Sequence, residues 1–313
     1  MIRIATRRSP LAKWQANHVS DLLRRQEPGL EVRLHEVVTK GDKILDVPLA
    51  DVGGKGLFVK EIEDALLAGD AEVAVHSMKD LPAELAEGLV VAAVPEREDP
   101  RDALCSPRYR TLDALPKGAR VGTSSLRRSA QLKAIRPDLE IEVVRGNVET
   151  RLRKASESLD AVVLAYAGLR RLGLAQHATH VFSPDEMLPA VAQGALALEA
   201  RAADAATLKR LAALEHAETR ARTEAERGFL GRIEGGCQVP IAGHATVEGD
   251  RVHLRALVAS LDGARVIRAE RSGPIADARG MGVAVAEELL SKGADAILRE
   301  CEGKLAGMAA PRR

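Results

Sequence analysis

Hydrophobic segments short enough to be buried strands alternate with segments of helical period along the first 215 residues of the chain. Apolar or alternating runs predict strands at residues 2–6, 32–38, 71–76, 89–94, 120–122, 140–144 and 161–166. Helices are expected to begin at Ser9 and Pro10 and to cover residues 57–67, 125–135 and 148–156. This alternation is typical of an α/β fold with mixed, largely parallel sheets.

The pattern begins again after the proline-bounded stretch at residues 95–100. Two such units predict two α/β lobes with a cleft between them. Residues 39–56 have no regular period and end in a glycine cluster. Because irregular loops of this length are usually functional or disordered, we expect a long mobile loop here.

The pattern changes after Glu215, where a long charged helix is expected to run to about Arg232. A glycine-rich turn with a cysteine follows, and then alternating strands with hairpin turns at residues 249–250 and 262–263. One last helix is expected over residues 280–299. These elements predict a smaller α+β domain at the carboxyl end.

Composition excludes several classes of protein. The chain has 313 residues, 46% of them hydrophobic and 29% charged, which excludes wholesale disorder. No apolar run has the roughly 18 residues of a membrane span, and the amino terminus lacks the apolar core of a secretory signal, so a cytoplasmic protein with no membrane partner is expected. The low aromatic content of 2% and the net charge of +1 oppose nucleic-acid binding.

No metal centre or disulfide framework is expected either. The three cysteines are scattered and form no C-x-x-C pair. His177 and His180 have the spacing of two ligands on a helix, but no acidic residue or cysteine accompanies them.

Arginine dominates the basic residues, with 34 arginines among the 46 lysines and arginines. A GC-rich genome accounts for part of this excess. The planar guanidinium also suits bidentate binding of carboxylate or phosphate, so the positions of the arginines matter.

Arginines collect where predicted strands end and helices begin. Residues 122–128, with the sequence GTSSLRR, place three hydroxyl side chains and two arginines at such a turn. Residues 144–153 have the same plan, and Arg7, Arg8 and Ser9 follow the first strand. Exposed N–H groups at a helix start favour anions, and open α/β sheets bind ligands beyond their strand ends. Together these turns predict a site for a polyanionic ligand, although capped helices with solvated arginines would explain each turn alone.

A second candidate follows the strand at residues 71–76. Asp80 at a cleft mouth is a candidate acid, base or cation-stabilising group, although a surface ion pair with Lys79 is the simpler interpretation. His76, within the strand, is more often a structural residue than a ligand.

The third candidate is Cys237. Most buried cysteines are inert, but Gly235, Gly236 and Pro240 place this one in a turn rather than on a packing face. It is therefore a candidate nucleophile.

Together these motifs resemble the porphobilinogen deaminase family, also called hydroxymethylbilane synthases. The resemblance covers almost the whole chain in the family's order. It is carried by IATR at residues 4–7 and then by VGGKGLFVKEIE, AVHSMKDLP, EREDPRDA, VGTSSLRR, RGNVETRL, LAYAGLRRLGL, LPAVAQGAL, EGGCQVPI and LRALV. The departures are small: Arg8 is often another polar residue in the family, and the tail after Gly303 is variable.

The resemblance implies three domains, of which the first two are similar to type II solute-binding lobes. Their expected bounds are residues 1–96 with about 194–213, residues 97–193, and residues 214–313. It also implies a monomer that joins four porphobilinogen molecules head to tail, releases ammonia and yields 1-hydroxymethylbilane. The implied cofactor is a dipyrromethane primer held by a thioether, and no metal is implied.

The resemblance assigns roles residue by residue. Asp80 matches the catalytic aspartate and Cys237 the cysteine that holds the primer. The arginines that match carboxylate-binding positions are Arg7, Arg127, Arg128, Arg145, Arg151 and Arg171. The other matching binding positions are Ser9, Lys55, Phe58, Ser77, Lys79, Thr123, Ser124, Ser125, Gly146 and Gln193.

This chemistry would explain the residue types. Each porphobilinogen carries an acetate and a propionate, so primer and substrates present about a dozen carboxylates for paired arginines. Loss of ammonia leaves a cationic azafulvene that a carboxylate such as Asp80 stabilises. The loop at residues 39–56 would act as a lid that excludes water.

Two other functions are compatible with parts of the sequence. A two-lobed anion-binding or sensing protein would bind without turnover, and a transferase with a cysteine nucleophile would act on another acidic substrate. The absent export signal and the Gly-Gly-Cys turn at residues 235–237 oppose the first.

Overall fold

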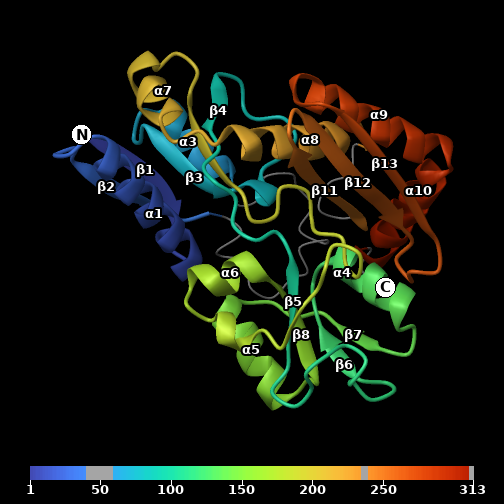
Figure 1. The fold of residues 1–313 in the computed structure, drawn as a ribbon. Coiled ribbons are helices and arrows are strands. Elements are labelled where there is room, and N and C mark those ends of the chain that lie inside the picture. The colour runs from blue at the N-terminus through green and yellow to red at the C-terminus, as the bar shows by residue number, and fades with distance from the viewer. Residues whose placement is uncertain (40–58, 234–238, 310–313) are drawn as a thin grey trace. The chain divides into compact units, whose positions relative to one another are not determined.

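The computed structural model describes residues 1–39, 59–233 and 239–309 of the chain (Figure 1). The described residues divide into two compact units. The first holds residues 1–39, 59–98 and 194–220, and the second holds residues 99–193, 221–233 and 239–309.

The first unit is built on a five-stranded sheet of order β2-β1-β3-β10-β4. Its elements are β1 (Ile2–Arg7), α1 (Pro10–Gln26), β2 (Val32–Val37), α3 (Lys60–Leu67), β3 (Val73–Ser77), the 3-10 turn η1 (Met78–Asp80), β4 (Leu89–Ala93), β10 (Leu196–Arg201) and α7 (Ala205–Ala212). β1 pairs in parallel with β2 and β3, whereas β10 is antiparallel to both β3 and β4. Four strands therefore point one way and β10 points the other.

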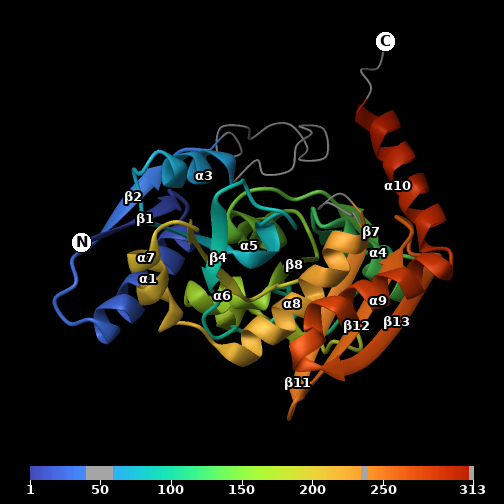
Figure 2. The same ribbon diagram turned by 90° about the horizontal axis from the view of Figure 1, so that it is seen from above.

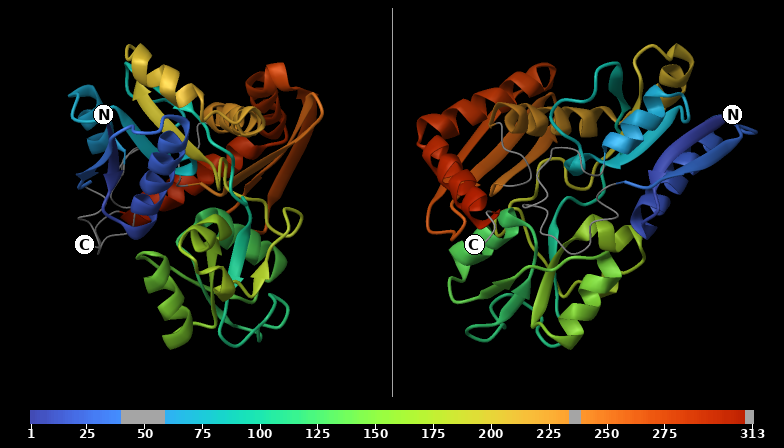
Figure 3. Two further views of the ribbon diagram at one scale, coloured as in Figure 1. Left: turned by 60° about the vertical axis from the view of Figure 1, so that its left-hand side comes forward. Right: turned by 180° about the vertical axis from the view of Figure 1, so that it is seen from behind.

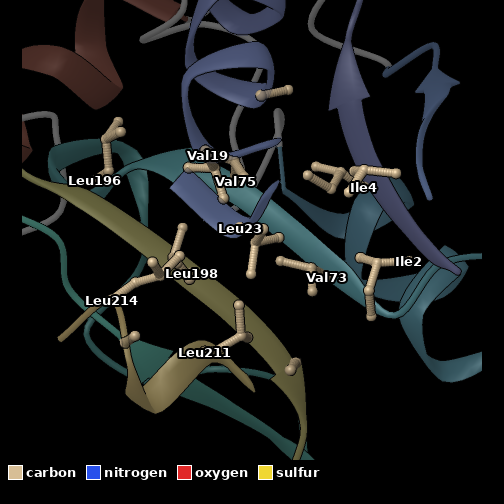
Figure 4. Packing of buried hydrophobic residues seen from close by; sticks show 14 of the residues in the cluster. Ile2, Ile4, Val19, Leu23, Val73, Val75, Leu196, Leu198, Leu211 and Leu214 are labelled. Atoms are coloured by element: carbon tan, nitrogen blue, oxygen red, sulfur yellow. The ribbon is translucent and has the colours of Figure 1, made fainter. Parts of the chain in front are cut away.

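Alternation along β3 gives this sheet two buried faces. Val73 and Val75 face the cluster of Figure 4, in which Val19 and Leu23 of α1 and leucines of β10 and α7 pack together. Ala74, one residue out of phase, belongs to the cluster beneath α3. Because both faces are covered, the consecutive apolar residues 73–75 are stable at the centre of the sheet.

The second unit contains a sheet of the same plan, with the order β7-β6-β8-β5-β9. Its elements are β5 (Asp102–Cys105), β6 (Arg120–Gly122), α4 (Leu126–Ile135), β7 (Glu140–Glu142), α5 (Val148–Glu157), β8 (Ala161–Ala165), α6 (Tyr166–Arg171), the 3-10 turn η2 (Ala175–His177) and β9 (His180–Val181). β6 is parallel to β7 and β8, and β5 is antiparallel to β8 and β9. The predicted α/β class with mixed, largely parallel sheets is confirmed.

The carboxyl-terminal part of the second unit is a three-stranded antiparallel sheet. Its elements are α8 (Ala217–Ile233), which precedes the sheet, β11 (Ile241–Glu248), β12 (Arg251–Ala259), β13 (Val266–Pro274), the 3-10 turn η3 (Ile275–Asp277), α9 (Ala278–Ser291) and α10 (Ala294–Ala309). The helices α9 and α10 lie against the strands, as Figures 2 and 3 show in red and orange. The smaller α+β part and both hairpin turns are confirmed.

Differences from the predicted elements have identifiable causes. The predicted strands lie within two residues of their observed ends. The single helix expected over residues 280–299 is wrong, because Gly293 has φ +94° and separates α9 from α10. The antiparallel strands β5 and β10 were not predicted, since each carries a carboxylate where a buried strand is normally apolar.

None of the described helices combines the length and the apolar character of a membrane-spanning segment.

Candidate functional site

The turn η1 at the end of β3 carries the predicted catalytic aspartate. Gln15 of α1 donates a hydrogen bond from Nε2 to Ser77 Oγ at 2.8 Å, and the Met78 amide donates to Ala195 O at 3.0 Å. The Met78 side chain is fully buried, whereas Asp80 is exposed and Lys79 half-buried. The backbone of the turn is thus anchored while the carboxylate at its end faces solvent.

The alternative for Asp80 was a surface ion pair with Lys79. Among the described residues, Lys79 and Asp80 form no ion pair with each other.

His76 is a structural residue in the described chain. Its Nε2 lies 2.9 Å from Glu199 Oε2 on the adjacent strand β10, and both side chains are buried. Glu63 of α3 faces the same region, where burial and the nearby Glu199 charge raise the pKa of the Glu63 carboxyl. The prediction that His76 is not a ligand agrees with this burial.

The cluster after β1 is split between a helix cap and the surface. Ser9 is the N-cap of α1 and accepts a hydrogen bond from the Ala12 amide at 3.3 Å. Arg7 is half-buried, while Arg8 is exposed and pairs with Glu36 at 3.4 Å. Ser9 therefore acts first as a cap, which leaves Arg7 as the half-buried cation of this turn.

The turn between β6 and α4 uses its hydroxyl groups to start the helix. Ser125 is the N-cap and accepts from the Arg128 amide, while Thr123 Oγ1 accepts from the Ser125 amide at 3.1 Å. Thr123 is buried and Ser124 is exposed. Of the three hydroxyl residues, Ser124 is the one with its side chain outside the turn.

Arg127 and Arg128, the two arginines of this turn, are buried rather than solvated. Arg127 Nη1 lies 2.6 Å from Asp102 Oδ2, and Arg128 binds the other carboxylate oxygen through Nε at 2.9 Å and Nη2 at 2.8 Å. Their exposures are 5% and 6%, and Asp102 has none. The interpretation of this turn as a capped helix with solvated arginines is therefore wrong.

Asp102 stays ionised in this setting. Burial by itself would raise the pKa of its carboxyl, but the charges of Arg127 and Arg128 and the hydrogen bond from Gln193 hold that pKa far below its usual range. Burial also lowers the pKa of Arg127, against the effect of Asp102. The cluster thus contains two guanidinium groups and one carboxylate.

Asp102 was not among the residues predicted from the sequence, although it lies in the motif EREDPRDA. A signal was present: an acidic residue opens a run of small apolar residues at 102–105, and a buried charge needs a partner of opposite sign. Its partner Arg127 lies 25 residues away in the sequence, and only the folded structure shows that the two side chains meet.

The turn between β7 and α5 presents Arg145 and Gly146. Gly146 has φ +111°, and a Cβ there would lie 2.8 Å from Thr150 Cγ2, so any other residue would strain the backbone and displace the Thr150 side chain. Asn147 caps α5 by accepting from the Thr150 amide at 2.8 Å. Arg151 Nε donates to Gly146 O at 2.9 Å, which ties the helix back to the turn.

Arg145 has unsatisfied hydrogen-bonding capacity. Its side chain is half-buried, and its Nη2 atom is buried without an acceptor among the described residues. The Arg127 Nε atom is also buried and lacks an acceptor among the described residues. Buried donors that lack acceptors are uncommon in folded proteins and fit a site for an anionic ligand.

The remaining predicted residues are distributed as follows. Arg171 is buried at the end of α6, and Gln193 is fully buried and bound to Asp102. Lys55, Phe58, Cys237 and all but the first residue of the loop at 39–56 lie outside the described residues. In the described part of the chain, no three His, Cys, Asp or Glu side chains are grouped as metal ligands.

Two family models match nearly the whole chain. Residues 2–209 match the model described as porphobilinogen deaminase, dipyromethane cofactor binding domain. Residues 221–291 match the porphobilinogen deaminase C-terminal domain.

Similar proteins give the same result. The chain is 58% identical over 300 residues to a porphobilinogen deaminase of Nitratidesulfovibrio vulgaris strain Hildenborough, covering 95% of each chain. It is 57% identical to that of strain DP4, with the same coverage. Among solved structures, a putative methionine-binding lipoprotein from Bacillus subtilis is 16% identical, with a TM-score of 0.42 over 69% of this chain and 90% of the other. From the family models and the curated relatives, this chain belongs to the porphobilinogen deaminase family.

Proposed function

We propose that this member of the family carries out its reaction with Asp80 as the catalytic carboxylate and with the arginines of the second unit as receptors for substrate and cofactor carboxylates. The reaction is that of hydroxymethylbilane synthase, a transferase of tetrapyrrole biosynthesis. It joins four porphobilinogen molecules head to tail and releases ammonia. The observation that carries the assignment of the receptors is the buried Arg127–Asp102–Arg128 cluster.

The described residues fit a dipyrromethane cofactor. This cofactor carries acetate and propionate groups, and the second unit offers two guanidiniums against one carboxylate. The buried Arg145 Nη2 and Arg127 Nε atoms are donors that lack protein acceptors in the described chain. Arg127, Arg128, Arg145, Arg151, Arg171, Thr123, Ser124 and Ser125 would hold these carboxylates, and Cys237 would form the thioether. When bound, the cofactor supplies the pyrrole carbon to which the first substrate is joined.

Asp80 is suited to stabilise positive charge on the substrate. When the amino group of porphobilinogen leaves as ammonia, its methylene carbon stays on the pyrrole ring, and the azafulvene that remains is cationic. An exposed carboxylate on an anchored turn can meet the pyrrole N–H and this charge without much reorganisation. Ser77 and Lys79 precede it in the chain, Arg7 is the last residue of the neighbouring strand β1, and Ser9 follows that strand.

The proposal extends to organisation and setting. We infer three domains, at residues 1–96 with about 194–213, at 97–193 and at 214–313. Lys55 and Phe58 would belong to a lid at residues 39–56. The enzyme is proposed to act as a monomer in the cytoplasm, with no nucleic-acid or membrane partner.

Mass spectrometry of the intact protein tests the cofactor. The expected mass exceeds that of the polypeptide by two linked pyrrole units, and Cys237→Ser removes this excess. Cys105→Ser and Cys301→Ser are matched controls that should keep it, because both thiols are buried. An unmodified mass in active enzyme would contradict the proposal.

Ammonia release separates this function from its main alternative. Purified protein incubated with porphobilinogen is expected to release one ammonia for each substrate consumed. Tight binding of porphobilinogen without ammonia would instead support an anion-binding or sensing protein.

A further inference from the structure

Asp102 is the point where four segments of the second unit meet. It opens β5 with no exposed surface. One carboxylate oxygen accepts from Arg127, and the other accepts from Arg128 and, at 2.9 Å, from Gln193 Nε2. Gln193 Nε2 also donates to Pro100 O at 2.7 Å, so the amide that meets Asp102 is itself fixed.

Backbone carbonyls complete the arrangement around the two arginines. Arg127 Nη1 donates to Leu188 O at 2.8 Å, and Arg128 Nη1 donates to Val163 O at 3.0 Å. Each guanidinium is thus held by a carboxylate and a carbonyl: Arg127 makes both contacts through Nη1, whereas Arg128 uses Nε and Nη2 for the carboxylate and Nη1 for the carbonyl. Since a guanidinium is planar, two contacts of this kind fix the direction of its remaining N–H groups.

The charges of the cluster do not cancel. Two permanently charged guanidiniums and one ionised carboxylate leave a net charge of +1 among buried groups. Without Asp102, two like charges would be buried side by side, which is strongly unfavourable. With it, the pair is stable and still attracts one further anion.

We infer that Asp102 is a positioning residue for the carboxylate-binding arginines Arg127 and Arg128. It allows both guanidiniums to be buried and sets their directions before any ligand arrives. A preorganised receptor of this kind binds a carboxylate without the cost of ordering two long side chains. The inference rests on the proposed function, because it takes the carboxylates of the substrate and cofactor as the ligands.

The test uses Asp102→Asn in the full-length enzyme, with Asp138→Asn as the matched control. Asp138 pairs with Arg136 at 2.7 Å in the same unit, but it has no contact with the cluster. For Asp102→Asn, we expect the KM for porphobilinogen to rise at least about tenfold, with kcat per primer-loaded molecule changed by less than about threefold. Asp138→Asn should keep both constants within about twofold of wild type.

The division between KM and kcat separates positioning from a structural role. Loss of folded enzyme lowers the apparent kcat and leaves KM unchanged. An unchanged KM for Asp102→Asn would therefore overturn the inference, whatever happens to stability. If the wild type itself lacks the primer and turnover, the proposed function fails instead, so the two failures are distinguishable.

A second variant covers the case in which Asp102→Asn does not fold. Gln193→Leu removes the donor to Asp102 Oδ1 and leaves both arginine pairs in place. We expect a smaller rise in KM, of about threefold to tenfold. If Gln193→Leu folds with wild-type KM, the inference is wrong.

Discussion

Each five-stranded sheet carries one fully buried carboxylate on its antiparallel strand, and the two have different partners. Glu199 on β10 of the first unit lies 2.9 Å from His76 on the neighbouring strand. Asp102 on β5 of the second unit binds two arginines from α4, beyond the end of a strand. The strand topology is the same, but one carboxylate ties two strands together and the other organises a cationic cluster.

The difference shows how one sheet plan serves two chemical tasks. In the first unit the buried Glu199 contacts His76 within the sheet, and another acid, Asp80, is left exposed beyond the end of β3. In the second unit the buried carboxylate of Asp102 pairs with Arg127 and Arg128, and these three groups together keep one positive charge. An exposed carboxylate and an excess of buried cations, the two features on which the proposed function depends, thus arise in separate parts of the chain.

The largest expected effect belongs to Asp80. Because the Asp80 side chain is exposed, Asp80→Asn should leave the thermal unfolding midpoint within about 2 °C of wild type. Turnover should fall by at least about a hundredfold, since a charge-stabilising group is lost. Ammonia release and circular dichroism measure the two quantities. A variant with near-normal ammonia release would remove Asp80 from the reaction.

Glu199→Gln is expected to affect stability rather than catalysis. Disturbing the buried contact between Glu199 Oε2 and His76 Nε2 costs about 1–3 kcal/mol in the free energy of unfolding, which urea denaturation measures. The control is Glu63→Gln, which removes a carboxyl whose pKa is raised by burial and by Glu199, and which should be neutral or stabilising. If Glu199→Gln left stability unchanged and abolished turnover, His76 and Glu199 would have to be counted among the catalytic residues.

Gly146→Ala tests the second unit's turn at β7. With φ +111° and Thr150 Cγ2 at 2.8 Å from the added Cβ, we expect a loss of about 1–3 kcal/mol in stability and a raised KM. Gly173→Ala is the control, because Gly173 also has positive φ but no atom within 4 Å of an added Cβ. Equal effects of the two substitutions on KM would show that the turn at Gly146 has no special role in binding.

The smallest expected effect concerns the reactivity of Cys105, whose thiol lies on the same strand as the carboxylate of Asp102. Burial raises the pKa of the Cys105 thiol to about 12, in spite of the Arg128 charge, whereas Asp102 at the start of β5 is kept ionised. Cys105 should therefore resist iodoacetamide at pH 9 in the native protein, with peptide mass spectrometry as the readout. Rapid labelling of Cys105 in folded enzyme would contradict this assignment.

The raised pKa of the Cys105 thiol also predicts that the protein loses stability at alkaline pH. The thiol pKa is higher in the folded chain than its unfolded value of about 8.5, so the associated stability is complete below that value. It is lost as the pH rises toward about 12. Cys105→Ala should reduce this alkaline loss, which unfolding midpoints between pH 8 and pH 11 would show.

Local pattern was sufficient for much of the fold. The apolar runs at residues 2–6 and 161–166 predicted strands, and the Ser9 and Ser125 caps marked the starts of α1 and α4. β5 and β10 escaped prediction because their stability comes from distant partners that pair their charges. The break at Gly293 escaped because a single glycine is also tolerated inside helices.

The sequence by itself determined the family, the α/β class and the turns at which the candidate residues lie. Only the tertiary structure decided that Arg127 and Arg128 are buried around Asp102 and that His76 is bound to Glu199. The physical reason is distance along the chain. Caps and periodicity act over a few residues, whereas the pairs that neutralise buried charge join positions 25, 26 and 123 residues apart.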